Sequence, residues 1–310
     1  MTIAIVGAGA IGSLFGGLLA RSGQTVWLYN RSYVAHVQAI AKSGTLTLAT
    51  ADAELRVPVR AVTRVDEIDG PVDLMLIAVK AYDTANAIAD AAGLVSEDTL
   101  ALSLQNGVGT DRVIADHVPE DRILRGITAQ AANITTPGVV RWAGSGPTIL
   151  GWCDPDVARP DERAKPVVDA FSEAGLETEF AADIRPSIYE KLLVNAAINP
   201  LTAIFDVPNG RLVEDPLLRA LLVDLARETH PIVASQGVSL SAAAAVDRVT
   251  TVCERTADNV SSMLQDVRRG KRTEIEHING AVVRMGDDLD VPVPLNRLVT
   301  ELIRRRRHPD

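Results

Sequence analysis

The sequence predicts an α/β protein in which a parallel, doubly wound sheet is followed by an all-helical region. In the first half of the chain, short runs of β-branched and aliphatic residues alternate with amphipathic helical patterns. This alternation is typical of parallel strands joined by helices, and the nearly continuous apolar runs indicate strands covered on both faces. After Asp183 the strand signals almost vanish. We therefore predict two domains, residues 1–182 and 183–310.

The predicted elements of the first domain follow the order that this architecture requires. Strands are expected at residues 2–7, 25–30, 72–80 and 99–105, and helices at 11–23 and 32–44. Gly23 suits the position just after a helix, where a left-handed backbone is common. Residues 45–62 alternate with a period of two and indicate a hairpin. Further strands are expected at 138–144, 147–152 and 177–182, around one helix at about 160–175.

Helical periodicity dominates the second domain. The expected helices span residues 186–199, 215–236, 241–268, 273–289 and 295–306. Pro200 cannot donate a hydrogen bond to the carbonyl of Ala196 and disfavours a helical Asn199, so the first of these helices should kink or end there. That would leave backbone polar groups free at this point. Gly270 should separate the third helix from the fourth.

Composition and charge limit the functions open to the chain. Of its 310 residues, 47% are hydrophobic and 23% charged, as in a soluble globular protein. The net charge of −9 argues against nucleic acid or an anionic membrane as the main partner. Cys153 and Cys253 have no histidine at ligand spacing, so we expect no metal site and a reducing cytoplasm. No apolar run is long enough to span a bilayer.

The segment GAGAIG follows the first predicted strand and opens the first helix. Its glycines form the G-x-G-x-x-G pattern of loops that bind the pyrophosphate of a dinucleotide. The first glycine permits the tight turn, the second lets the backbone approach the pyrophosphate, and the third lets the helix pack closely on the strand. The helix N-terminus faces the anion. We therefore predict a Rossmann-type domain whose cofactor-binding loop contains Gly7, Gly9, Ala10, Ile11 and Gly12.

The end of the second predicted strand indicates which dinucleotide binds. NAD-selective sites place Asp or Glu there to bind the ribose 2′-hydroxyl, whereas this chain has Asn30, Arg31 and Ser32. Arg31 can pair with a 2′-phosphate through two hydrogen bonds, and Ser32 can add a donor. Lys80 ends the third strand at the same edge of the sheet, where it can contact a phosphate or the ribose. NADPH is therefore the expected cofactor.

A narrow polar stripe runs along the predicted helix in YEKLLVNAAINP. Lys191, Asn195 and Asn199 recur at i, i+4 and i+8 and fall within an arc of about 80°, with apolar residues on both sides. Reduction of a ketone by hydride leaves an alkoxide that needs an acid. Lys191 can be that acid, because partial burial lowers the pKa of an ammonium group toward neutrality. The two amides can hold substrate oxygens.

Three further polar residues are candidates for the same chemistry. Asn106 belongs to an Asn-Gly turn at the carboxyl edge of the sheet, where it can hold the nicotinamide or the substrate. Ser262 lies within a predicted amphipathic helix. Glu274 is expected in the first turn of the next helix, where the helix dipole stabilises its charge. A carboxylate near Lys191 would raise the pKa of that ammonium group again.

Together these segments resemble the ketopantoate reductases, which are NADPH-dependent 2-dehydropantoate 2-reductases. The resemblance covers essentially the whole chain in order, through GAGAIG, LIAVKAY, SLQNGVG, YEKLLVNAAINPLTAIFDVPNG and SSMLQDVRRGKRTEIEHINGAVV. It implies a Rossmann domain, an all-helical second domain and an active site in the cleft between them. The implied reaction is the reduction of 2-dehydropantoate to (R)-pantoate in the route to pantothenate and coenzyme A.

The resemblance also implies a role for each candidate residue. Lys191 stands at the position of the lysine that protonates the alkoxide, and Glu274 at that of the glutamate that binds substrate and orients the lysine. Asn106 corresponds to the asparagine that positions the substrate and the cofactor amide. The groups that hold the carboxylate and hydroxyl of the ketoacid correspond to Asn195, Asn199 and Ser262. Contacts to the adenosine phosphate correspond to Arg31 and Lys80.

One stretch departs from the family pattern and leaves alternatives open. Where many members carry a Thr-x-x-Gly-Ala-like segment, this chain reads GITAQAANI, with Gln130 and Ala131, and we expect it to border the substrate pocket. A reductase of another branched 2-oxo acid is therefore an alternative. A β-hydroxyacid dehydrogenase is a second, although that family usually carries a G-L-G-x-M-G loop. A non-catalytic NADP(H) sensor is a third, although it would often lack the acid at Lys191. The expected partner is a small 2-oxo acid, with a homodimer as an option.

Overall fold

The computed structural model describes residues 1–31, 34–154 and 161–306. The chain divides into two compact units, of which the first comprises Met1–Gln105 and Thr110–Ile184. The second comprises Asn106–Gly109 and Arg185–Asp310. The division lies beside residue 183, but the loop 106–109 belongs with the C-terminal unit. The predicted fold class is confirmed, since the first unit contains a largely parallel sheet and the second is built of helices.

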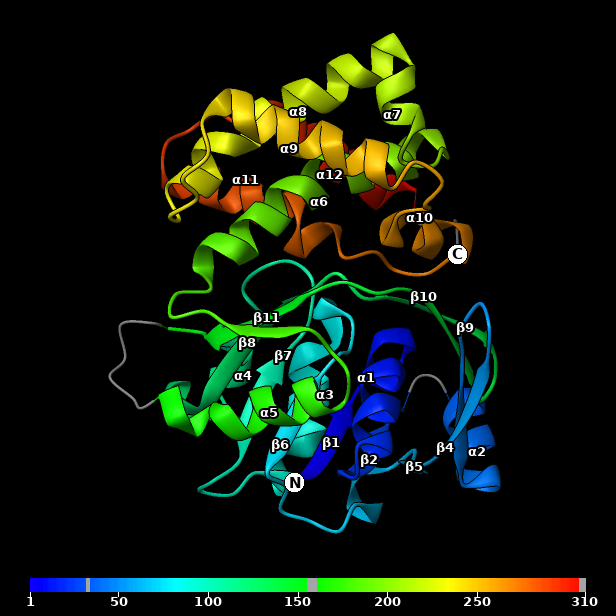
Figure 1. Ribbon diagram of the computed structural model, residues 1–310. Coiled ribbons are helices and arrows are strands. Elements are labelled where there is room, and N and C mark those ends of the chain that lie inside the picture. Colours follow the sequence, from blue (N-terminus) through cyan, green and yellow to red (C-terminus); the bar gives the residue numbers. More distant parts are fainter. Residues whose placement is uncertain (32–33, 155–160, 307–310) are drawn as a thin grey trace. The chain divides into compact units, whose positions relative to one another are not determined.

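The described residues of the first unit form an eight-stranded sheet in the order β12-β11-β8-β7-β6-β1-β2-β5 (Figure 1). These strands are β1 (Thr2–Val6), β2 (Thr25–Tyr29), β5 (Arg60–Val62), β6 (Leu74–Ile77), β7 (Leu100–Ser103), β8 (Ile123–Thr128), β11 (Thr148–Trp152) and β12 (Thr178–Phe180). The strands from β8 to β5 run parallel, whereas β11 is antiparallel to β8. The chain leaves β8 and returns to β11 at the same edge of the sheet, which reverses the direction of β11.

A second sheet of four strands, in the order β4-β3-β10-β9, lies in the same unit among the described residues. It contains β3 (Thr45–Ala49), β4 (Glu54–Pro58), β9 (Ala131–Thr136) and β10 (Val139–Gly144). The antiparallel pair β3–β4 confirms the predicted hairpin for residues 45–58, whereas the last predicted residues, Arg60–Val62, form β5 in the main sheet. The parallel pairing of β10 with β3 joins segments about ninety residues apart, and no local pattern in the sequence indicates it.

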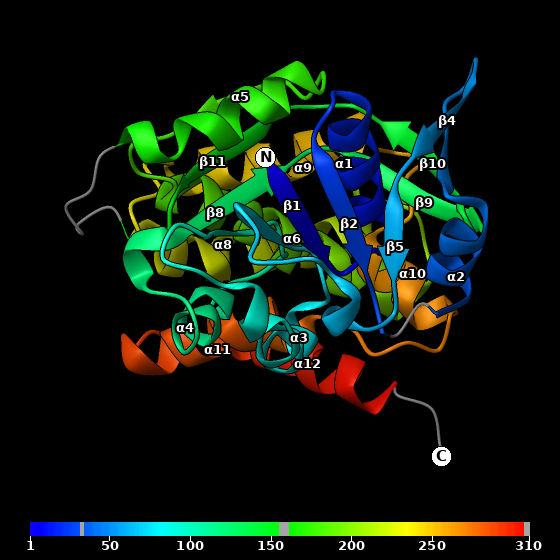
Figure 2. The same ribbon diagram turned by 90° about the horizontal axis from the view of Figure 1, so that it is seen from below.

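Helices cover both faces of the main sheet (Figure 2). One apolar cluster contains residues of α1 (Ala10–Arg21), α2 (Val34–Ser43) and α5 (Lys165–Glu173), and the other contains residues of α3 (Thr84–Ala91) and α4 (Thr110–Ala115). The predicted helices at 11–23, 32–44 and 160–175 correspond to α1, α2 and α5, although residues 32, 33 and 160 lie outside the described residues. Gly23 follows α1 with a φ of 97°, as predicted.

Helix α1 lies between the two sheets, and two adjacent glycines allow this. A Cβ atom on Gly16 would come within 2.4 Å of Leu28 in the main sheet. A Cβ atom on Gly17 would come within 2.9 Å of Leu46 in the second sheet. The Gly-Gly pair therefore lets one helix approach a sheet on either side, and this holds the dinucleotide-type loop at the start of α1 close to β1.

The second unit contains seven α-helices among its described residues. They are α6 (Arg185–Phe205), α7 (Arg211–Glu214), α8 (Pro216–Ala234), α9 (Ala242–Arg255), α10 (Ser262–Arg268), α11 (Asn279–Asp288) and α12 (Pro294–Arg305). Helix α6 is central, because α8, α9, α10 and α12 all pack against it. Its opposite sides contribute to two apolar clusters, one with Leu193 and Ile198 and the other with Leu192 and Ala196.

Helix α6 continues through Pro200 to Phe205, so the predicted end at Asn199 is wrong. The carbonyl of Ala196, which has no donor at Pro200, accepts a hydrogen bond of 2.8 Å from Nδ2 of the buried Asn279. This backbone group is therefore not free, contrary to the prediction. A side chain 83 residues later replaces the missing N–H, and the local sequence holds no sign of it.

The helix predicted over residues 241–268 is interrupted, because its middle pairs with a distant loop. Helix α9 ends at Arg255 and α10 begins at Ser262. The carbonyls of Asn259 and Ala257 accept hydrogen bonds from the N–H groups of Asn209 and Gly210. Ser261 then caps α10, since its hydroxyl accepts a hydrogen bond from the N–H of Leu264 at 3.1 Å.

The helix predicted over residues 273–289 is also divided. Glu274 precedes a short 3₁₀ turn, η6 (Ile275–His277), and α11 begins only at Asn279. The prediction that Glu274 lies in the first turn of a long helix is therefore wrong. The physical reason is that the carbonyl of His277 accepts a hydrogen bond from the N–H of Val108 at 3.1 Å. This contact fastens the loop 106–109 to the helical unit.

Candidate functional site

The glycine loop between β1 and α1 has the geometry of an anion-binding turn. Gly7 has a φ of 109°, and a Cβ atom there would lie 2.4 Å from the N atom of Val79. A Cβ atom on Gly12 would lie 2.2 Å from the carbonyl oxygen of Gly7. A Cβ atom on Gly9 would meet nothing within 4 Å, so its α-carbon faces open space. A pyrophosphate requires this open space to approach the backbone before Ala10 and Ile11, the first residues of α1.

The loop after β6 carries Lys80 and is held by a residue that the sequence analysis did not single out. The buried Gln105 donates from Nε2 to the carbonyl of Val79 at 2.9 Å and to Oγ1 of Thr84 at 2.8 Å. Gln105 thus holds the chain immediately before Lys80, at Val79, and four residues after it, at Thr84. Because Val79 also contacts Gly7, the same hydrogen bonds keep the two loops together at the carboxyl edge of the sheet.

Arg31 lies two residues beyond β2, and its charge is paired within the first unit. Its Nη1 atom donates to Oδ2 of Asp90 at 3.0 Å, and the hydroxyl of Tyr29 donates to the same oxygen at 3.1 Å. Burial, followed by the hydrogen bond to Asp90, raises the pKa of Tyr29 to about 12. The carboxylate that β2 lacks is thus supplied beside Arg31 by α3. Ser32 lies outside the described residues.

The polar stripe of α6 is present as a row of three side chains, of which the last is the most buried. Lys191 and Asn195 are half-buried, and Asn199 is only 6% exposed. The amides of Asn195 and Asn199 make no hydrogen bond to any residue that the structure describes. A buried amide normally has a partner in the protein or a ligand, so this stripe can bind a polar molecule.

Helix α10 is attached to α6 at Thr202, about one turn after Asn199. Oγ1 of Thr202 in α6 lies 2.7 Å from Oγ of Ser261, the cap of α10. Ser262, the first residue of α10, is exposed. The two adjacent serines therefore differ, since Ser261 is used by the fold and Ser262 is available for a ligand.

Asn106 and Glu274 lie together in the second unit, although 168 residues separate them. Nδ2 of Asn106 donates to Oε2 of Glu274 at 3.4 Å, and Glu274 is 5% exposed. Gly107 allows this approach, because a Cβ atom there would lie 2.3 Å from the carbonyl oxygen of His277. The structure thus brings together two residues that the sequence analysis singled out for separate reasons.

His277 lies in the same turn as Glu274, and no sequence pattern singled it out. Burial lowers its pKa, against the nearby charge of Glu274, which acts in the opposite direction. Its Nδ1 atom is buried and has no hydrogen-bond partner among the residues described. No motif could have indicated this position, because it depends on the contact of this turn with Val108.

Gln130, where the sequence departs from the family pattern, is used within the first unit. Its Nε2 atom donates to the carbonyl of Gly146 at 2.6 Å, and its Oε1 atom accepts a hydrogen bond of 2.8 Å from Nε1 of Trp142. Ala131 begins β9. The two polar atoms of Gln130 thus connect the turn after β8 to β10 and to the segment between β10 and β11.

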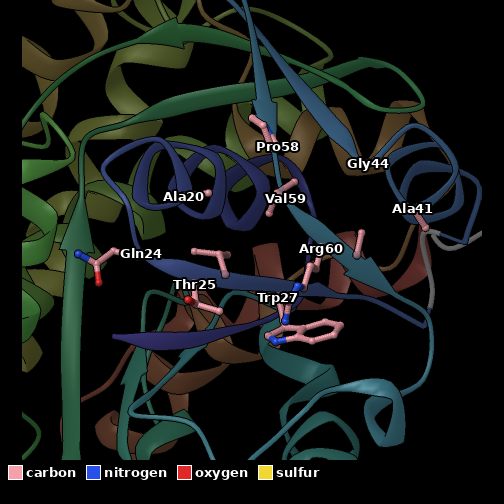
Figure 3. Close-up of a pocket in the computed structure, with 11 residues that line it drawn as sticks. Ala20, Gln24, Thr25, Trp27, Ala41, Gly44, Pro58, Val59 and Arg60 are labelled. Atoms are coloured by element: carbon pink, nitrogen blue, oxygen red, sulfur yellow. The ribbon is translucent and has the colours of Figure 1, made fainter.

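A cavity of about 550 Å³ lies at the amino-terminal end of β2, where it is lined by Thr25, Trp27 and Arg60 among others (Figure 3). Arg60 lies over the ring of Trp27, with its guanidinium carbon 4.9 Å from the ring centroid. The glycine loop follows the opposite, carboxyl end of the parallel strand β1. This cavity is therefore separate from the predicted dinucleotide site.

Two classes of site find no support in the part of the chain that is described. Over residues 1–31, 34–154 and 161–306, no three histidine, cysteine or carboxylate side chains gather as a metal site requires. Within the same ranges, every helix is too short or too polar to cross a membrane.

Comparison with protein families and curated sequences gives matches along nearly the whole chain. Residues 3–155 match the family described as ketopantoate reductase PanE/ApbA, and residues 183–307 match its C-terminal domain. A 2-dehydropantoate 2-reductase from Halobacterium salinarum is 39% identical over 304 residues, which is 98% of each chain. One from Pyrococcus abyssi is 36% identical over 304 residues, 98% of this chain and 97% of the relative.

Solved structures with the same fold include two kinds of enzyme. A D-mandelate dehydrogenase in complex with NADH and anilino(oxo)acetate superposes with a TM-score of 0.91 at 31% identity, over 99% of this chain and 98% of that one. A PanE/ApbA family ketopantoate reductase from Ralstonia eutropha has a TM-score of 0.88 at 34% identity, over the same shares. These full-length matches favour this family over the β-hydroxyacid dehydrogenases that the motifs left open.

Proposed function

Since this chain belongs to the ketopantoate reductase family, whose members are dinucleotide-dependent oxidoreductases, we propose that it reduces 2-dehydropantoate to (R)-pantoate with NADPH. In this proposal residues 1–182 bind the dinucleotide and residues 183–310 bind the ketoacid and supply the proton. The reaction would serve a cytoplasmic route to pantothenate and coenzyme A.

The polar stripe of α6 carries the proposal. A small 2-oxo acid presents a carboxylate and a ketone oxygen, and both need donors. Asn195 and Asn199 offer amide N–H groups that are not engaged by the described residues, on the same helical face as the Lys191 ammonium. Asn199 is nearly buried, so a hydrogen bond to substrate there would be shielded from water and correspondingly stronger.

The residues of this chain have distinct tasks in the proposed reaction. When bound, a reduced nicotinamide supplies the hydride that reaches the C2 carbonyl carbon. Lys191 donates a proton from Nζ to the alkoxide oxygen that this transfer leaves. Glu274 binds substrate and orients Lys191, and Asn106 positions the substrate and the cofactor amide. The hydrogen bond from Asn106 to Glu274 supports a shared site for these two residues. The carboxylate and the hydroxyl of the ketoacid are held by Asn195, Asn199 and Ser262.

The dinucleotide site is proposed from the geometry of the first unit. Gly9 leaves open space for the pyrophosphate, and the first turn of α1 at Ala10 and Ile11 presents N–H groups to it. Arg31 and Lys80 provide positive charge for the adenosine phosphate. The lack of a carboxylate directly after β2 supports NADPH as the cofactor.

A second candidate function has a specific observation in its favour. The D-mandelate dehydrogenase complex with NADH has a TM-score of 0.91 with this chain. A reductase of aromatic 2-oxo acids that uses NADH is therefore the competing proposal. The two differ in the side chain of the 2-oxo acid and in the preferred dinucleotide, so one set of assays separates them.

The test is oxidation of NADPH and of NADH by purified protein, followed by absorbance, with 2-dehydropantoate and with phenylglyoxylate. We expect the highest kcat/KM with 2-dehydropantoate and NADPH. The variant Lys191→Ala should lose on the order of 10²–10⁴ in kcat, as for removal of a general acid. The control is Lys165→Ala, because Lys165 pairs with Asp169 on the exposed side of α5 and should keep the original rate. A near-native kcat for Lys191→Ala would refute the proposed acid.

A further inference from the structure

Asp90 stands out because it connects the two residues that flank the end of β2. Its Oδ2 atom accepts hydrogen bonds from the Tyr29 hydroxyl at 3.1 Å and from the Arg31 guanidinium at 3.0 Å. Asp90 comes from α3, about sixty residues later in the chain. No nearby sequence pattern connects it with the nucleotide site.

Tyr29 fixes the position of this carboxylate. It is 4% exposed and ends β2, so its ring is held by the sheet and its hydroxyl points to Asp90. Because the pKa of Tyr29 is raised to about 12, the phenol remains a proton donor throughout the physiological range. The Asp90 carboxylate is therefore kept beside Arg31 by a rigid group rather than by the arginine alone.

The ion pair itself adds little to the stability of the fold. The side chains of Arg31 and Asp90 are 45% and 37% exposed, and exposed pairs of this kind are weak. Asp90 is also the only partner of Arg31 among the residues that the structure describes. An anion that binds the Arg31 guanidinium more strongly can therefore replace Asp90 as its partner.

A 2′-phosphate would meet this carboxylate as a competitor. It needs the guanidinium of Arg31, and its own negative charge is repelled by Asp90 at short range. A ribose 2′-hydroxyl needs no cation, and a carboxylate can accept its hydrogen bond. The Oδ1 atom of Asp90 has no partner among the described residues and could be such an acceptor.

We propose that Asp90 is a specificity-determining residue that competes with the 2′-phosphate for Arg31 and so reduces the preference of this chain for NADPH over NADH. The inference rests on the proposed dinucleotide site. It concerns the choice between dinucleotides and is independent of which 2-oxo acid is reduced.

The test is equilibrium binding of NADPH and NADH to the full chain, by titration calorimetry, without any 2-oxo acid. Asp90→Asn keeps the shape of the side chain and removes the charge. We expect NADPH to bind about three- to tenfold more tightly to this variant, whereas NADH binds equally well or more weakly. In Arg31→Ala the same substitution at Asp90 should have little effect on NADPH, because the group for which the two anions compete is gone.

The matched control is Asp169→Asn, which removes the same charge from an exposed ion pair on α5, on the opposite face of the sheet. It should leave both affinities unchanged. Weaker or unchanged binding of NADPH to Asp90→Asn would overturn the inference, and weaker binding would mean that Asp90 prepares Arg31 for the phosphate. If the original chain bound neither dinucleotide, the proposed dinucleotide site would be refuted, and the role of Asp90 with it.

Discussion

Gly107 and Gly109 flank Val108 in a loop whose conformation depends on single residues. Both glycines have a positive φ, of 79° and 90°. They differ in their surroundings, because a Cβ atom on Gly107 would lie 2.3 Å from the carbonyl oxygen of His277, whereas one on Gly109 would meet nothing within 4 Å. At Gly107 the absence of a side chain therefore serves both the backbone conformation and the approach of Asn106 to Glu274.

This difference predicts unequal effects of the same substitution. Gly109→Ala should lower the free energy of unfolding by about 1–2 kcal/mol, from the unfavourable φ alone. Gly107→Ala should cost more, because the added methyl group also displaces the loop from His277. It should in addition raise the KM for the 2-oxo acid, since Asn106 moves away from Glu274. The measurements are urea unfolding and steady-state kinetics, and equal losses for both variants would contradict the argument.

At the scale of elements, α6 shows how a helix can pass through a proline. Asn279 donates to the carbonyl of Ala196 at 2.8 Å and to Oδ1 of Asn296 at 2.9 Å. Asn296 in turn donates from Nδ2 to Glu228 at 2.9 Å and to Thr229 at 3.1 Å. A buried polar network thus connects α6 with α11, α12 and α8. It holds the part of α6 that carries the polar stripe.

The role of Asn279 can be measured with a double-mutant cycle. Asn279→Ala should lower the free energy of unfolding by about 1–3 kcal/mol, because it leaves the buried carbonyl of Ala196 without a donor. Pro200→Ala restores the backbone N–H at this place. In the Pro200→Ala variant, the loss in free energy of unfolding caused by Asn279→Ala should be smaller by about 1 kcal/mol. Both losses are measured by urea unfolding. If Asn279→Ala cost the same free energy in both backgrounds, Asn279 would not stabilise the chain by replacing the N–H group that Pro200 lacks.

Over the whole molecule, each unit has its own core and one histidine whose pKa is lowered by burial: the buried His36 in the first unit and the half-buried His277 in the second. His36 in the first unit accepts a hydrogen bond at Nδ1 from the N–H of Gly138 at 3.0 Å, and its Nε2 atom lies 3.1 Å from Oγ of Ser13. It therefore connects α2 with α1 and with the turn of the second sheet as a neutral ring. His277 differs from His36 in that its Nδ1 atom has no partner among the described residues, but burial is the main cause that lowers the pKa of both rings.

These two histidines predict a loss of stability in mild acid. The pKa values of both rings in the folded chain lie below the ordinary value of 6.5. As the pH falls through 6.5, the unfolded chain therefore binds more protons than the folded chain. Stability is therefore complete above it and decreases below it. Thermal unfolding between about pH 7.5 and 5 should show a falling midpoint. The hydrogen bond to Arg304 lowers the pKa of Glu276 below 4.5. Its stabilising effect is therefore present above pH 4.5 and is lost only in stronger acid, below the range in which the histidines act.

The variants His36→Gln and His277→Gln assign this effect to each unit. Glutamine keeps a polar group at each position but does not titrate, so each variant should flatten part of the decrease between neutral and mildly acidic pH. A midpoint that stays constant over this range in the original chain would exclude the protonation of both rings as a source of acid sensitivity.

Local sequence patterns were sufficient for most elements of the first unit and for the glycine loop. The strands β1, β2, β6 and β7 and the helices α1 and α2 were predicted because their apolar periodicity and bounding glycines reflect contacts within a few residues. The helices of the second unit were predicted less well, because tertiary hydrogen bonds from Asn209, Gly210 and Val108 end two of them early.

Spacing along the chain was enough to predict the dinucleotide-type loop, the polar stripe of Lys191, Asn195 and Asn199, and a division near residue 183. These features depend on the spacing of residue types along a strand or helix, which the sequence displays directly. In contrast, hydrogen-bond partners of Arg31, of the Ala196 carbonyl and of Glu274 come from distant elements that pack beside them. Those partners are Asp90, Asn279 and Asn106, at separations of 59, 83 and 168 residues. A hydrogen bond over such a separation depends on how whole elements pack, and no local pattern contains that information.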